Sequence, residues 1–168
     1  MAKRFNLDKA LANAARITVN KIITKGKAAA NRRVRETYYI KAADLNKSMK
    51  ITRASYSNPE AQLRIRGRRI AVYAFGARQT KKGVTVRIRR DRGRKLIRHA
   101  FIAAMPTGHT GVFQRKTIKR LPIKELYSLS PAQMFELEGV KEVNLIIERE
   151  GGKILQHEID YQMSKFNK

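Results

Sequence analysis

The chain has 168 residues, of which 42% are hydrophobic, so it is long enough to bury a core as a single domain without disulfides or metals. The absence of cysteine excludes a disulfide framework, a thiolate nucleophile and zinc sites with sulfur ligands. The 38 Lys and Arg residues outnumber the 13 Asp and Glu residues, and the resulting net charge of +25 favours an anionic partner: nucleic acid first, then acidic proteins, then anionic lipid.

The first third of the chain has the apolar spacing of a helix. Residues at three- and four-residue intervals are Leu7, Leu11, Ala14, Ala15, Thr18, Ile22 and Ile23. Asn6 is the candidate N-cap, and Gly26 either ends this helix or lies within one that continues to about residue 34. A second short helix is expected at 42–49, with its cap near Asp44. Residues 1–49 therefore form a helical N-terminal part.

From residue 50 the hydrophobic period changes to two, which predicts half-buried strands. The alternation covers 50–55, 62–66, 70–72 and 84–89, with turns at Asn58-Pro59, Gly67, Lys82-Gly83 and Asp91-Arg92-Gly93. A further pair, 101–104 and 112–115, is joined by a connection from Met105 to Gly111, in which Gly108 and Gly111 are expected to have positive φ. Residues 50–120 are thus expected to form a basic body around a central, mainly antiparallel twisted sheet.

Helical spacing returns after Pro122 and Pro131. One stripe contains Val140, Val143, Ile147, Ile154, Leu155, Ile159, Met163 and Phe166. Gly151-Gly152 lies inside this stripe, and we expect one long helix there. The acidic residues of this segment have the spacing of solvated helix pairs, such as Glu138 with Lys141. No linker separates the parts, so the sequence predicts one α+β domain, 1–168, with a helical C-terminal element at 121–168.

Signals for catalysis are weak. His157-Glu158 begins like the metalloprotease motif H-E-x-x-H, but Tyr161 stands where the second histidine is required. His99 and His109 lie far from it in sequence. The glycine patterns of a nucleophile elbow, a P-loop and a dinucleotide-binding turn do not occur. Between residues 62 and 124 the only acid is Asp91, in a turn. We therefore expect no enzyme activity, metal or cofactor, and the sequence shows no secretion signal or membrane span.

The informative feature is a series of basic residues on the predicted strands. Because side chains alternate across a strand, arginines project away from the apolar face, and we expect them to form one positive sheet face. The residues assigned to contact with DNA or an acidic partner are Arg64, Arg66, Arg68, Lys81, Lys82, Arg87 and Arg89. Guanidinium groups bind phosphate or carboxylate oxygens without reading sequence. On composition alone, a nucleic-acid-binding protein of ribosomal or nucleoid type stays an alternative.

Three stretches, in this order and spacing, resemble the phage minor tail protein Z family, the tail completion proteins of long-tailed phages and prophages. They are FGARQTKKGV at 75–84, AFIAAMPTGHTGVF at 100–113 and KRLPIKELY at 119–127. The resemblance covers roughly residues 60–135. This chain departs from the family where Ser128-Leu129-Ser130-Pro131 follows the third stretch, since the family tends to have Gly-Pro-Ser there.

The resemblance implies a structural virion protein at the head-proximal end of the tail, assembled in the host bacterial cytoplasm. It would help to complete the tail, join it to the head and position the end of the packaged DNA. The implied partners are tail terminator and neck or connector proteins, further copies in a ring expected to be hexameric, and packaged double-stranded DNA. Residues assigned to assembly interfaces are Phe75, Met105, Pro106, His109, Leu121, Pro122 and Tyr127. The sequence leaves open whether the arginines face DNA or acidic protein neighbours.

Overall fold

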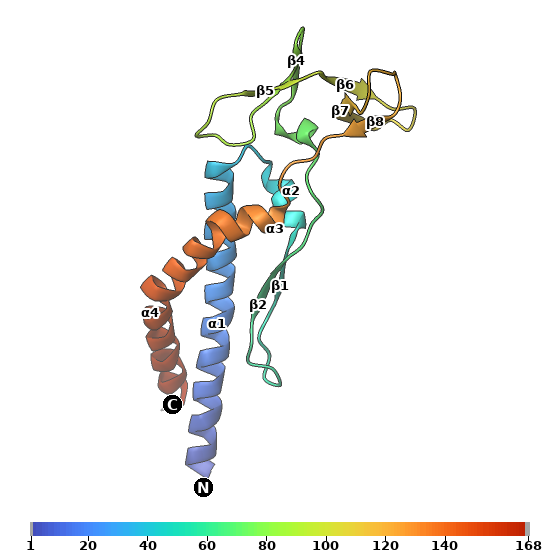
Figure 1. Cartoon of the computed structure of the whole chain (residues 1–168). Coiled ribbons are helices and arrows are strands. Elements are labelled where there is room, and N and C mark those ends of the chain that lie inside the picture. Colours follow the sequence, from blue (N-terminus) through green and yellow to red (C-terminus); the bar gives the residue numbers. More distant parts are fainter. Residues whose placement is uncertain (1, 167–168) are drawn as a thin grey trace.

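A long helix, α1 (Ala2–Thr37), runs lengthwise between the C-terminal helix and the first β-hairpin (Figure 1). The computed structural model describes residues 2–166, and the side chains of residues 7–165. At 1.5 Å per residue, α1 is about 54 Å long. It begins before Asn6, so the expectation that Asn6 is the N-cap is wrong. The helix also continues through Gly26, because the alanines and arginines that follow it are good helix formers.

The buried side of α1 is made of small residues at four-residue intervals. Ala14, Thr18, Gly26 and Ala30 are all buried, which lets a second helix, α4 (Val140–Phe166), pack closely and antiparallel to it (Figure 1). A Cβ added to Gly26 would lie 3.3 Å from Val143 Cγ1. Gly26 is therefore a point of close helix contact.

The C-terminal helical segment is continuous from residue 131. It consists of α3 (Pro131–Met134), the π-helical turn η2 (Phe135–Gly139) and α4. The Ser130 side chain accepts a hydrogen bond from the Gln133 backbone N–H, and Gln133 Oε1 accepts one from the Ser130 backbone N–H, so the two form a capping box with Pro131 in the first turn. The departure from the family pattern thus encodes a strong helix start. The predicted long helix through Gly151-Gly152 is confirmed.

The strands form three small antiparallel sheets, so the α+β class is confirmed, while the expectation of a single central sheet is wrong. The helix α2 (Ala42–Lys47) precedes them. The sheets are β1-β2, β3-β4-β5 and β6-β7-β8, with bounds β1 Met49–Thr52, β2 Gln62–Ile65, β3 Arg78–Thr80, β4 Gly83–Val86, β5 Lys95–Arg98, β6 Ala100–Ala104, β7 Thr110–Arg115 and β8 Ile123–Glu125.

Three local expectations are corrected by the structure. The segment 70–72 is no strand but leads into a 3₁₀ turn, η1 (Val72–Phe75), which ends at Gly76 with φ 61°. The N-cap of α2 is Lys41, without a side-chain cap, and Asp44 lies inside the helix. Gly108 has the expected positive φ of 79°, whereas Gly111 does not; a Cβ on Gly111 would lie 2.8 Å from Glu125 Oε1, so space rather than conformation requires glycine there.

The interior consists of two hydrophobic clusters. The first joins the upper end of α1 to α2, β1, η1 and α3, and contains Val34, Tyr38, Leu45, Phe75 and Met134, among others. The second lies between the two three-stranded sheets. It contains Val72, Val84, Val86, Ala100 and Val112. Ile88 packs against both clusters and connects them.

Candidate functional site

The basic residues predicted to share one sheet face are divided over two sheets. Arg64 lies on β2 and is exposed, while Leu63 and Ile65 alternate with it and pack against the first core cluster, as predicted. Arg66 follows β2 and is also exposed. Arg87, in contrast, lies just beyond the end of β4, and β4 belongs to a different sheet from β2. The expectation of one continuous guanidinium face is therefore wrong, because strand period does not determine which strands pair.

Arg89 is engaged inside the fold. Its Nη2 lies 2.9 Å from Asp91 Oδ2, its Nη1 lies 3.6 Å from Glu138 Oε1, and its guanidinium carbon is 5.4 Å from the centre of the Tyr38 ring. The hydrogen bond from Arg89 holds the pKa of Asp91 below its ordinary value. Glu138 also forms an ion pair with Arg33. The expected pair of Glu138 with Lys141 is therefore replaced by pairs with Arg33 and Arg89. These contacts leave Arg89 little capacity for an external anion.

A positive surface surrounds the β3–β4 turn, which projects at the top of the molecule (Figure 1). We call it the basic hairpin, defined by Arg78, Lys81, Lys82, Lys95 and Arg98, all exposed. The register places Thr80 opposite Gly83 and Gly83 opposite Arg98, so the lysines occupy the turn and the other three lie on the flanking strands. Between residues 62 and 124 the sequence has 19 Lys and Arg residues and one acid, Asp91. Asp91 forms an ion pair with Arg89.

The predicted interface residues differ in exposure. Phe75 is completely buried in the first core cluster, so its assignment to an assembly interface is corrected to a core role. Pro106 and Pro122 are exposed, Met105 is half-buried, and Leu121 is 65% exposed. Ile118, which the sequence reasoning missed, is fully exposed in the same loop as Leu121. A lone isoleucine among Lys116, Lys119 and Arg120 was the available signal.

His109 and Tyr127 meet at a carboxylate. His109 Nε2 lies 2.8 Å from Glu125 Oε1, and the Tyr127 hydroxyl donates to Glu125 Oε2 at 2.6 Å. Burial raises the pKa of the Glu125 carboxyl, but the hydrogen bonds from Tyr127 and His109 more than offset it, so that this pKa lies below its ordinary value. The hydrogen bond to Glu125 raises the pKa of Tyr127. This cluster ties the 105–109 connection to β8, and it holds half-exposed side chains in fixed positions.

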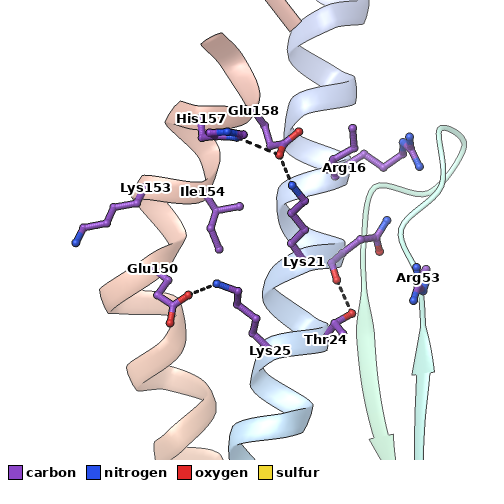
Figure 2. A pocket seen from close by; sticks show the side chains of 12 residues that line it. Arg16, Lys21, Thr24, Lys25, Arg53, Glu150, Lys153, Ile154, His157 and Glu158 are labelled. Carbon is purple, nitrogen blue, oxygen red and sulfur yellow. Dashed lines mark hydrogen bonds and ion pairs between the residues drawn. The ribbon is translucent and has the colours of Figure 1, made fainter. Parts of the chain in front are cut away.

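A groove of about 1010 Å³ lies between α1, α4 and the β1–β2 hairpin (Figure 2). Its walls are residues 16–25 of α1, residues 150–158 of α4, and Arg53. Asn20 holds the hairpin against α1 through two hydrogen bonds with the Ala54 backbone, of 2.9 and 3.0 Å. We call this feature the α1–α4 groove.

Two ion pairs cross the α1–α4 groove. Lys21 Nζ lies 2.5 Å from Glu158 Oε1, and Lys25 pairs with Glu150 one turn along α1 (Figure 2). Glu158 is only 3% exposed, and the hydrogen bond from Lys21 holds its pKa below the ordinary value despite burial. The acids of α4 therefore neutralise part of the basic face of α1.

Replacing Lys21 with methionine should lower the free energy of unfolding by about 1.5 kcal/mol at pH 7, because it leaves the buried Glu158 carboxylate with His157, whose Nδ1 lies 3.5 Å away, as its remaining partner. The half-exposed lysine keeps the loss below that of a fully buried pair. Since the folded-state pKa of Glu158 is lowered, the contribution is complete above its ordinary pKa of 4.5 and disappears as the pH falls through the lowered value. Urea denaturation between pH 7 and pH 3 measures this.

The matched control is Lys25→Met, whose pair with Glu150 is exposed on both sides and should contribute less than about 1 kcal/mol. Equal losses for the two variants, or a Lys21→Met effect that does not diminish in acid, would contradict the assignment.

The described residues contain no group of three or more His, Asp or Glu side chains that could hold a metal ion. Within the same residues, no helix has the length and hydropathy needed to cross a membrane. The described residues instead offer exposed positive surfaces, exposed apolar side chains in a basic loop and a lined groove.

A comparison with protein families places the chain in one of them. The family model of prophage minor tail protein Z matches residues 5–168, essentially the whole chain, and the chain belongs to that family. The resemblance seen in the three sequence stretches is thereby confirmed and extends to both terminal helices. The protein is a phage minor tail protein, a structural component of the virion. No curated protein and no solved structure matches the chain.

Proposed function

We propose that the protein acts without catalysis at the head-proximal end of the phage tail, where it completes the tail, joins it to the head and positions the end of the packaged DNA. The observation that carries this proposal is the charge of residues 62–124, which contain 19 Lys and Arg residues and one acid, Asp91, that is paired with Arg89. A polyanion such as double-stranded DNA, or an acidic neighbour at the neck, is the natural counterpart of such a surface.

Copies arranged in a ring would repeat this surface around a channel, so that each protomer contributes the same cations. The residues proposed to face DNA or an acidic neighbour are Arg64, Arg66, Arg68, Lys81, Lys82 and Arg87, all of which are exposed. The proposed contacts with the tail terminator, the connector or adjacent copies come from the exposed residues of the loops, in particular Pro106, Leu121 and Pro122. Phage particles lacking a functional copy should carry incomplete or unjoined tails.

Charge reversal at Arg64 and Arg66 tests the proposal. Both side chains are exposed beside strand β2, so Arg64→Glu combined with Arg66→Glu changes four units of charge without removing buried contacts. We expect the double variant to reduce the yield of infectious particles at least about tenfold, which corresponds to a loss of about 1.4 kcal/mol in one binding step. Plaque titre, electron microscopy of tails and nuclease protection of packaged DNA give three separate readouts.

The control is Lys141→Glu, an exposed reversal on α4, which should leave the titre unchanged. Unjoined tails with normally retained DNA would assign these arginines to an acidic protein neighbour. Joined tails that lose their DNA would assign them to DNA. Normal titre, with both joined tails and retained DNA, would contradict the proposed role of this surface.

A further inference from the structure

The α1–α4 groove has more positive charge than its own acids can neutralise. Lys21 forms an ion pair with Glu158, and Lys25 forms one with Glu150. Among the described residues, Arg53 and Lys153 of the groove wall have no ion-pair partner. Arg16 donates from Nη2 to Asn13 Oδ1, and its buried Nε has no acceptor. The groove therefore offers cationic groups with unused capacity to bind carboxylates.

The length of the groove suits a short helix. Its wall on α1 extends from Arg16 to Lys25, which at 1.5 Å per residue is about 14 Å. This length corresponds to about two and a half helical turns. A helix in this position would add a third member to the α1–α4 pair, with its apolar side against the half-buried Ile17 and Ile154.

The groove is also held in shape before anything binds. The Tyr56 hydroxyl donates to Asn13 Oδ1 at 2.9 Å, and the Arg16 guanidinium lies 4.5 Å from the centre of the Tyr56 ring. Together with the hydrogen bonds between Asn20 and Ala54, these contacts fix the hairpin wall on α1. A preformed groove loses less conformational entropy when a partner enters it.

We propose that the α1–α4 groove binds an acidic amphipathic helix of about two and a half turns, supplied by a neighbouring protein of the tail. Its apolar side lies on Ile17 and Ile154, and its carboxylates pair with Arg53. That the partner is a tail protein rests on the proposed function, whereas the capacity to bind such a helix does not. The site is separate from the basic hairpin, so the chain has two anion-binding surfaces with different requirements.

A synthetic peptide tests the proposal on the full-length chain. The probe is a fluorescein-labelled 14-residue peptide of Glu, Leu and Ala, with leucines on one helical face and both ends blocked. Fluorescence anisotropy should show saturable binding that weakens as salt rises. Arg53→Glu should weaken it about tenfold, and Thr24→Trp, which fills the groove from an exposed position on α1, should weaken it similarly. Circular dichroism verifies that both variants are folded.

Lys141→Glu, an exposed reversal outside the groove, is the matched charge control and should bind the peptide as the unmodified protein does. A leucine-free peptide of the same charge should bind at least about tenfold more weakly. Binding that is unaffected by Arg53→Glu or by Thr24→Trp, that falls equally with Lys141→Glu, or that needs no leucines would overturn the inference. Because Arg64→Glu with Arg66→Glu leaves the groove intact, failure of tail joining and failure of helix binding are separately visible.

Discussion

Replacing Phe75 with alanine should lower the free energy of unfolding by about 3–5 kcal/mol, the usual cost of truncating a fully buried aromatic side chain. Phe75 is 0% exposed and packs with Tyr38, Leu45 and Met134, where α1, α2 and α3 meet. Its removal leaves a cavity at the junction of three helices, which cannot collapse without moving all of them. Equilibrium urea denaturation followed by circular dichroism measures the change.

The control comes from the same 3₁₀ turn. Tyr73 lies two residues earlier and is 43% exposed, so Tyr73→Ala should cost less than about 1 kcal/mol. If Phe75 served an assembly interface, as the family stretch around it suggested, Phe75→Ala would leave the isolated protein stable and affect only tail assembly. A loss below about 1 kcal/mol would therefore contradict the core role.

Replacing Gly83 with alanine should destabilise the protein by about 3 kcal/mol or more. Gly83 has a φ of 146°, which side chains rarely adopt, and an added Cβ would lie 2.2 Å from the Ile97 carbonyl oxygen. The clash involves the backbone of the neighbouring strand, so relief requires separation of β4 from β5, with loss of ladder hydrogen bonds in addition to the conformational strain. Thermal unfolding and amide hydrogen exchange across β4 and β5 report this loss.

Gly93→Ala is the control, because nothing lies within 4 Å of a Cβ at that position and its φ is ordinary. It should change the free energy of unfolding by less than about 0.5 kcal/mol. Comparable stability of the two variants would show that the β3–β4–β5 sheet tolerates separation at this edge.

Local signals in the sequence predicted most of the elements. The apolar spacing indicated both long helices, and the turn residues at 105–111 indicated the β6–β7 hairpin. Ser130 and Gln133 show how local such signals are, since a helix start is set within four residues. The sequence did not indicate which strands pair with one another. Period-two alternation says which side of a strand is polar, but β2 and β4 joined different sheets for reasons that depend on distant segments.

The site residues follow the same division. Exposure of Arg64 was predictable from alternation with Leu63, whereas the engagement of Arg89 was not, because Glu138 comes from a helix 49 residues further along the chain. The α1–α4 groove was missed for the same reason, since three separate segments form it. Its available signal was two lysines, Lys21 and Lys25, one turn apart on a basic helix, and two glutamates, Glu150 and Glu158, on an acidic helix.

The loop at 116–122 keeps Ile118 fully exposed, and Leu121 largely so, in the free protein. Apolar side chains that are exposed to water promote aggregation, and charged residues beside them usually oppose it. Lys116, Lys119 and Arg120 surround the two apolar residues, so copies of the loop repel one another. The charges of the loop therefore oppose contact between its apolar side chains in separate copies of the free protein, which lowers the tendency of the chain to aggregate.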